Sequence, residues 1–321
     1  AASALAAGII TPQSTVNCGG RYTYYAGYQP RCLQLGHRGA VSMVTALRHS
    51  CNIYFYDVGR RLGVDTFSAT AQQLGLGAPC GTELPETTGR LTWSTDENYQ
   101  AGLALMAAIG QGNTSVSPLQ LAAYAGALAR DGQRPALHFA QSTTDAAGNI
   151  TWQAQPDVLA QAPGGAAVFA PIREGMAQMA QTLRALRESP IPLACKTGSP
   201  QRSEGYYAGS TYKHYTNAAM IAYGPAEDPE IAIGIVVEYG GAGARTGTLV
   251  ADIFNAYYAM KDGTLTVDEA AAESQAQPET AADAAETPAD GAADPAAGET
   301  EDAGQNDAAA APADAAATAG A

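Results

Sequence analysis

The chain has 321 residues, of which 46% are hydrophobic, and it carries a formal net charge of −14 at pH 7. Thirteen acidic residues lie from Asp268 onward, where no Lys or Arg occurs, so almost all of the net negative charge belongs to the C-terminal tail. The low pI therefore says nothing about a substrate, and the lack of a basic face argues against a nucleic-acid partner.

The sequence divides into a body and a tail. Residues 266–321 are mostly Ala, Asp, Glu, Pro, Gly and Thr. Since they have almost nothing to bury, we expect a disordered tail. Residues 1–265 are enough for one substantial core. This body has no initiator Met or signal peptide, and it opens like the second half of a helix ending at Gly8. No apolar run approaches the roughly 18 residues of a membrane span. We therefore expect a domain truncated at its N-terminus.

Capping residues and apolar periodicity predict helices along the body. Ser42 is a suitable cap for the first of them, and Asp65 for the third. Ser117, Pro118 and Gln120 form a capping-box pattern at the start of the fifth. The expected helices span residues 42–48, 53–62, 67–74, 96–109, 117–130, 169–188 and 246–260.

Strands are expected mainly near the end of the body. Residues 18–32 read as a loop or hairpin, and residues 135–168 as short strands around the turn at Gly148. Three further strands are predicted at residues 191–196, 218–223 and 231–238. The turn at residues 224–229 makes the last two antiparallel. The fold class is thus α+β, with an antiparallel sheet that the final helix can cover on one face.

Ser50-Cys51-Asn52 falls at the end of the first predicted helix. The hydroxyl of Ser50 can relay a proton, and the Asn52 amide can hold a peptide group because it offers both an acceptor and donors. The plainer interpretation is that both residues only cap helices.

Lys196-Thr197-Gly198 follows the buried apolar residues of a predicted edge strand. Lys196 can hold a carboxylate, Thr197 can donate a hydrogen bond to it, and Gly198 lets a ligand backbone lie close to the strand. The backbone N–H of Ser199 can point at a developing oxyanion. By itself this tripeptide is more often an ordinary strand end and turn.

Together, these motifs resemble the C-terminal part of the transpeptidase domain of class B penicillin-binding proteins. The likeness covers roughly residues 1–260 and is specific, because several motifs occur in the same order. It rests on the stretches at residues 46–56 (ALRHSCNIYFY), 59–63 (GRRLG), 108–112 (AIGQG), 117–122 (SPLQLA), 195–201 (CKTGSPQ) and 220–238.

The resemblance implies a penicillin-binding-protein/β-lactamase-like fold with a helical subdomain, and a peptidoglycan D,D-transpeptidase activity. Ser50 would pass a proton, Asn52 would orient the substrate, and the Lys196–Gly198 motif would bind the peptide carboxylate. Implied partners are stem peptides ending in D-Ala-D-Ala, β-lactams as covalent inhibitors, and a cell-wall glycosyltransferase. The implied location is the outer face of the bacterial cell membrane, with the anchor in the missing N-terminal part.

The sequence departs from the family pattern at the Ser-x-x-Lys motif that holds the nucleophile. The only such motif is Ser210–Lys213, which follows Lys196 instead of preceding Ser50. We expect the nucleophile shortly before Ala1, and the chain as it stands not to be acylated. Two other functions stay open: a related serine carboxypeptidase or β-lactamase, and a catalytically silent β-lactam sensor or scaffold.

Five cysteines occur, and two of them, Cys18 and Cys32, bracket a loop. They form either a disulfide, consistent with a domain outside the membrane, or two free thiols. Packing is the expected reason for Cys51 and Cys195. No Cys/His group has zinc-type spacing, and the histidines at 37, 49, 138 and 214 are scattered, so we expect no metal and no cofactor. Gln111 is a candidate for loop contacts at the site, although a helix C-terminal turn is the plainer interpretation.

Overall fold

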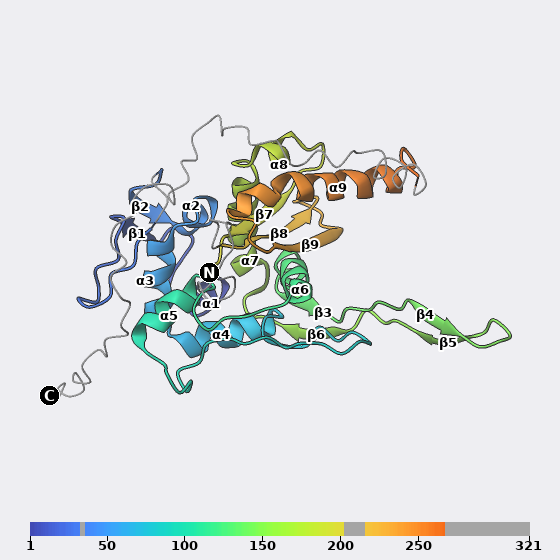
Figure 1. The fold of residues 1–321 in the computed structure, drawn as a ribbon, viewed down its shortest axis with the longest axis horizontal. Coiled ribbons are helices and arrows are strands. Elements are labelled where there is room, and N and C mark those ends of the chain that lie inside the picture. Colours follow the sequence, from blue (N-terminus) through green and yellow to red (C-terminus); the bar gives the residue numbers. More distant parts are fainter. Residues whose placement is uncertain (33–35, 202–215, 267–321) are drawn as a thin grey trace, which may run out of the picture.

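The computed structural model describes residues 1–32, 36–201 and 216–266 (Figure 1). Its helices are α1 (Ala2–Ala6), α2 (Met43–Arg48), α3 (Asn52–Leu62), α4 (Val64–Gln73), α5 (Ala101–Ala108), α6 (Pro118–Ala129), α7 (Gly165–Ala180), α8 (Arg184–Glu188) and α9 (Gly247–Lys261), with a 3₁₀ turn η2 (Gly243–Thr246) before α9. Its strands are β1 (Thr15–Cys18), β2 (Gly39–Ser42), β3 (Gln133–Pro135), β4 (Ser142–Thr144), β5 (Ile150–Gln153), β6 (Val158–Gln161), β7 (Ala194–Gly198), β8 (Ala218–Gly224) and β9 (Ile231–Val237).

A three-stranded antiparallel sheet of order β7-β8-β9 forms the centre of the fold. Side chains alternate between its faces, as the pleat of a strand requires. Met220 and Ala222 pack with Phe254 of α9 on one face. Ile221 and Tyr223 belong to the helical core on the other face, where α6 and α7 lie (Figure 1). The α+β class and the sheet covered by the final helix are thus confirmed.

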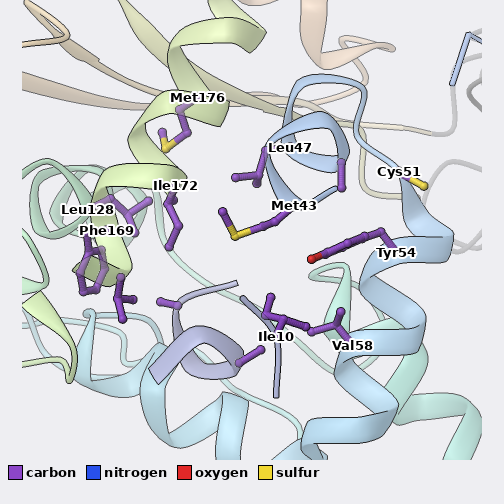
Figure 2. Close-up of a cluster of buried hydrophobic side chains, with 14 of the residues drawn as sticks. Ile10, Met43, Leu47, Cys51, Tyr54, Val58, Leu128, Phe169, Ile172 and Met176 are labelled. Carbon is purple, nitrogen blue, oxygen red and sulfur yellow. The ribbon is translucent and has the colours of Figure 1, made fainter. Parts of the chain in front are cut away.

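The helical core joins α2, α3 and α7 below the sheet. Figure 2 shows α2 inserting its apolar residues between the other two helices, with the sulfur of Cys51 at the edge of the cluster. Burying each such side chain stabilises the fold by about 1.5–3 kcal/mol. This packing fixes the position of the α2–α3 junction relative to the sheet. The residues include Met43, Leu47, Tyr54, Val58, Ile172 and Met176.

Two predicted helix starts are confirmed in detail. The Ser42 hydroxyl accepts from the Thr45 N–H at the start of α2. At α6, Ser117 and Gln120 form a reciprocal capping box with Pro118 in the first turn. Local capping chemistry is enough to specify both positions.

Other boundaries differ from expectation. Asp65 lies inside the first turn of α4 rather than at its cap, because its carboxylate accepts from the N–H and hydroxyl of Ser94 instead. The helix expected at residues 96–109 begins only at Ala101, and the one expected at 169–188 is broken into α7 and α8. Strand β7 begins at Ala194 and continues through the whole Lys-Thr-Gly motif, because each motif residue is paired with β8.

The segment from β3 to β6 forms an arm that extends from the body, with β4 and β5 as its outer hairpin (Figure 1). Strands β1 and β2 pair with each other beside α3, on the opposite side of the molecule from the arm. Within the described ranges, no helix combines the length and the apolar character that crossing a membrane would require. The expected tail after residue 266 and the Ser210–Lys213 motif lie outside the described residues.

Candidate active site

The Ser50 turn is built by the way α2 ends. The Cys51 N–H donates to Ala46 O (2.9 Å) and the Ser50 N–H to Leu47 O (3.3 Å), the paired bonds that close a helix around a left-handed residue. Ser50 has φ = 52°, a conformation in which glycine is more usual. The turn therefore exposes a hydroxyl where helices commonly place a residue without a side chain.

Lys196 approaches this turn from the sheet. Ala194, its neighbour on the same face of β7, belongs to the helical core, so Lys196 also faces the helices. Its Nζ donates to Ser50 Oγ (2.9 Å) and to the carbonyl of Thr197 (2.8 Å). Burial disfavours the charged ammonium and lowers the pKa of Lys196 to about 8. The structure thus brings the two sequence motifs into direct contact.

Asn52 is the first residue of α3, so it follows Ser50 within one turn of backbone. Its Nδ2 donates to Arg31 O (3.4 Å), at the end of the loop that starts at Cys18. Among the described residues, no donor bonds to the Asn52 carbonyl oxygen. The side chain therefore links the Ser50 turn to the 18–32 loop and retains an acceptor.

Thr197 and Gly198 continue β7 as half-buried residues paired with Met220 and Ala219 of β8. A Cβ built on Gly198 would meet nothing closer than 3.7 Å, so the glycine is not required by packing within the chain itself. Ser199, just after the strand, accepts the Gly243 N–H at its Oγ (2.9 Å). Its side chain therefore anchors the end of the strand.

Gly243 is a positioning residue that sequence reasoning missed. A Cβ on Gly243 would lie 2.3 Å from Gly198 O and 2.6 Å from Ala219 O, so only glycine lets η2 lie against the end of β7. The signal in the sequence is the glycine-dense stretch at residues 240–243. That density indicates a close backbone approach, but not which strand is approached.

Gln111 follows α5, and its N–H donates to Met106 O (3.0 Å). This is the helix C-terminal turn that was the plainer interpretation of the sequence. His138 Nδ1 donates to Glu83 Oε1 (2.7 Å), away from both motifs. His214 lies outside the described residues.

The cysteines lie closer together than their spacing in the sequence indicates. The sequence spacing of Cys and His indicates no zinc site, yet the side chains of Cys18, Cys32, His37 and Cys51 converge, with their ligand atoms all within 4.8 Å of one another. We call these four residues the thiol cluster. Cys18 and Cys32 are not joined by a disulfide in this structure. The spacing in the sequence does not reveal this cluster, because the residues come from the start of α3 and from the segments around β1 and β2, which meet only in three dimensions.

Comparison with known proteins identifies the family to which this fold and these motifs belong. A family model described as the penicillin binding protein transpeptidase domain matches residues 1–259. Peptidoglycan D,D-transpeptidase PbpA of Mycolicibacterium smegmatis is 32% identical over 231 residues, which are 70% of this chain and 45% of that protein. Peptidoglycan D,D-transpeptidase MrdA of Acinetobacter baumannii is 28% identical over 235 residues, which are 68% of this chain and 35% of that protein.

A solved structure of a penicillin-binding protein has a similar fold. The complex between penicillin-binding protein PBP2 and MreC from Helicobacter pylori matches with a TM-score of 0.66 and 26% identity, over 82% of this chain and 48% of that one. The chain thus spans less than half the length of each of these proteins. By its matched residues, its fold and its ordered motifs, this chain belongs to the class B penicillin-binding-protein transpeptidase domain family.

Proposed function

We propose that this chain is part of a peptidoglycan D,D-transpeptidase, which transfers an acyl group from a stem peptide ending in D-Ala-D-Ala to a second stem peptide. The observation that carries the proposal is the 2.9 Å hydrogen bond between Lys196 Nζ and Ser50 Oγ. It joins a proton-relaying hydroxyl to a cation at the edge of a sheet, where an extended peptide can be bound. β-Lactams would acylate the same site.

Each predicted residue has a role in this proposal. Ser50 passes a proton between the leaving amine and the nucleophile, with Lys196 as its hydrogen-bonded neighbour. Asn52 offers its side-chain carbonyl oxygen to a peptide N–H. Lys196 and Thr197 bind the terminal carboxylate, and Gly198 leaves room for the substrate backbone beside β7.

The oxyanion would be bound by backbone N–H groups, one of them that of Ser199. The acylated serine, in this proposal, comes from residues encoded before Ala1, on the helix of which α1 is the end. A serine at the start of that helix would then lie two or three turns from Ala1. In this proposal, residues 1–321 alone are not acylated.

The proposal extends to location and partners. The full-length protein would face the outside of the cell membrane and work with a cell-wall glycosyltransferase. The support is the family of the chain and the names of its relatives, which include D,D-transpeptidases of three genera.

The decisive experiment is labelling of the full-length gene product with a fluorescent penicillin. A transpeptidase gives a long-lived acyl-enzyme, whereas a carboxypeptidase or β-lactamase releases the label rapidly. Ser50→Ala and Lys196→Ala should both label far more slowly than the parent. If both variants label at the parent rate, the assigned roles are wrong. If the complete gene lacks a Ser three residues before a Lys upstream of Ala1, the silent sensor or scaffold is the better function.

A further inference from the structure

Residues 1–63 form the basic part of the body. They contain six arginines, no lysine and a single acidic residue, Asp57, which gives this segment a formal charge of +5. Since the tail carries −13 and the whole chain −14, the rest of the body carries −6. The near-neutral charge of the body thus hides a separation of charge, and the expectation that the body lacks a basic face is wrong for this segment. Its arginines are Arg21, Arg31, Arg38, Arg48, Arg60 and Arg61.

Two of these arginines are neutralised within the segment. Arg60 Nη2 lies 3.3 Å from Asp57 Oδ1, and Arg61 Nη1 lies 3.7 Å from Asp57 Oδ2. The guanidinium carbon of Arg60 also lies 3.7 Å from the centre of the Tyr24 ring, a cation–π contact. The one carboxylate of the segment is therefore already shared by two arginines, and the segment has no other to offer the remaining four.

Three of the remaining arginines lie close together beside the β1–β2 pair, and we call Arg21, Arg31 and Arg38 the arginine cluster. Arg21 and Arg31 are directly opposite each other in an antiparallel bridge, so their side chains leave the backbone on the same side. The guanidinium of Arg38 lies against Gly20, next to Arg21, with its carbon 2.7 Å from where a Cβ on Gly20 would lie. All three residues are exposed, and within the described ranges none of them forms an ion pair with a carboxylate.

An arginine cluster of this kind is unfavourable unless an anion lies on it. Like charges directly opposite each other on paired strands repel, so the bridge between Arg21 and Arg31 is destabilised by its own side chains. A carboxylate placed between the two guanidinium groups would remove the repulsion. Arginine also suits carboxylates better than lysine does, because its planar guanidinium donates two parallel hydrogen bonds. The cluster therefore fits a ligand that carries several carboxylates.

The tail has the matching chemistry. Its 55 residues after Thr266 carry thirteen carboxylates and no cation, and most of the rest are small residues such as alanine. Such a segment has little apolar surface to bury, so it can bind mainly through charge. Because the tail belongs to the same chain, its effective concentration at the cluster is on the order of millimolar, and weak individual contacts are enough.

The tail is also long enough to reach the cluster. Figure 1 shows the C-terminal end of α9 far from the β1–β2 pair, so the tail must extend past the body. A domain of this size has a radius of gyration of about 18 Å. A flexible linker as long as the tail has a root-mean-square span of about 40 Å and an extended limit of about 180 Å. Its carboxylates are spread from Asp268 to Asp314, so the distant part of the tail is charged as well.

We propose that the acidic tail docks on the arginine cluster, where its carboxylates bind the guanidinium groups of Arg21, Arg31 and Arg38. Arg31 O accepts from Asn52 Nδ2 (3.4 Å), so the docked tail lies beside the candidate active site. There it screens the arginines from other anions that approach the site.

Docking of the tail does not depend on the proposed function, whereas an effect of docking on acylation rests on it. The tests of docking therefore measure arginine reactivity and peptide binding, and neither needs an active enzyme. A chain whose tail docks as described but which never reacts with penicillin would overturn the proposed function alone.

The first test is the reactivity of the arginines in the full-length protein. The parent is compared with a tail-neutralised variant, in which every acidic residue from Asp268 onward is replaced by its amide. Both are treated with phenylglyoxal at low salt, and peptide mapping identifies the modified arginines. Arg21 and Arg31 should react about fivefold more slowly in the parent, because the carboxylates of the tail cover them. Arg184, which is exposed on α8 and pairs with Glu188, should react equally in both. Equal rates at Arg21 and Arg31 would overturn the proposal.

The second test is binding of a fluorescent peptide with the sequence of residues 267–321. It should bind the tail-neutralised variant, and bind the parent about tenfold more weakly, because the parent's own tail occupies the cluster. Combining Arg21→Gln and Arg31→Gln in the tail-neutralised chain should weaken binding by about tenfold or more. Combining Arg184→Gln and Arg187→Gln removes the same charge from α8 and should leave binding unchanged.

Two results of the peptide experiment contradict the proposal. Binding that is insensitive to the replacement of Arg21 and Arg31 would show that the tail does not dock on the cluster. If the peptide does not bind, and vesicles of phosphatidylglycerol bind the tail-neutralised variant through the same two arginines, the cluster serves an anionic lipid surface instead. Binding of the peptide that weakens as salt is raised supports docking by charge.

Discussion

The ammonium nitrogen of Lys196 lies 2.9 Å from the hydroxyl oxygen of Ser50, although 146 residues separate them in the chain. One group comes from the edge strand of a sheet and the other from a left-handed turn between two helices. The contact forms because β7 directs Lys196 toward the helical core, and because α2 is packed between α3 and α7.

Two replacements of Ser50 distinguish the role of its hydroxyl from the effect of its left-handed backbone conformation. Ser50→Ala and Ser50→Gly both remove the hydroxyl, so both should lower the rate of penicillin acylation by about 10²–10⁴-fold. Glycine suits φ = 52° better than alanine, so Ser50→Gly should be more stable than Ser50→Ala by about 1 kcal/mol. Urea unfolding and labelling kinetics of the full-length protein measure both quantities. Normal acylation by the glycine variant would remove Ser50 from the proton path.

The rate of acylation should depend on pH through Lys196. Its pKa is lowered to about 8 by burial, so the cation that binds a carboxylate is lost as the pH rises through this value. The second-order rate constant, which reports groups of the free enzyme, should fall about tenfold per pH unit above pH 8. Lys196→Arg retains its charge and should remove this decline, whatever its absolute rate. A rate that instead rises through pH 8 would show that neutral Lys196 acts as a base.

The lowered pKa of Lys196 also predicts that this residue destabilises the folded state. The pKa of Lys196 is about 8 in the folded state and 10.5 in the unfolded state. The charged ammonium therefore lowers the free energy of unfolding by its full amount below pH 8. Lys196→Met should therefore raise the free energy of unfolding at pH 7 by about 1–3 kcal/mol. The unfolded state holds more protons between pH 8 and 10.5, so the advantage of the variant should shrink over that interval. A pH-independent difference in urea titrations would contradict this explanation.

Gly243 should tolerate no side chain. The Cβ of Gly243→Ala would meet the carbonyl oxygens of Gly198 and Ala219 at 2.3 and 2.6 Å, so η2 or the end of β7 must shift. We expect a loss of about 1–3 kcal/mol in stability and slower acylation. Gly247→Ala is the matched control, because its Cβ meets only Leu183 at 4.0 Å. Equal behaviour of the two variants would rule out a positioning role for Gly243.

Gln120 should matter for stability alone. Its side chain is fully buried; Nε2 donates to Ala78 O (2.9 Å) and Thr88 O (2.8 Å), and Oε1 accepts from the Ser117 N–H (3.0 Å). Gln120→Leu leaves three backbone groups unpaired and should cost about 3–5 kcal/mol. Ser117→Ala loses only the cap and should cost about 1 kcal/mol. Thermal or urea unfolding compares them, and a similar small cost for both would show that water replaces the glutamine.

Local chemistry made much of this fold predictable from the sequence. The capping box at Ser117, the cap at Ser42 and the turn before Ile231 depend on residues within a few positions of one another, so their patterns are visible in the chain. The order and residue types of the motifs at Ser50 and Lys196 also predicted that the two lie in one site, and the structure brings their side chains into contact; their catalytic roles stay a prediction. Asp65 was misassigned because its carboxylate bonds to Ser94, 29 residues away, and such a partner leaves no local pattern.

What the sequence alone determined is thus most of the helices, the strands of the main sheet, the fold class and the residue types of the candidate site. Only the tertiary structure decided which groups meet: Lys196 with Ser50, Gly243 with the end of β7, and Cys18 with Cys51. These contacts depend on strand register and on how α2 packs between its neighbours, and both are set by the whole core. Periodicity and capping act over one or two turns, so they carry no information about distances across the fold.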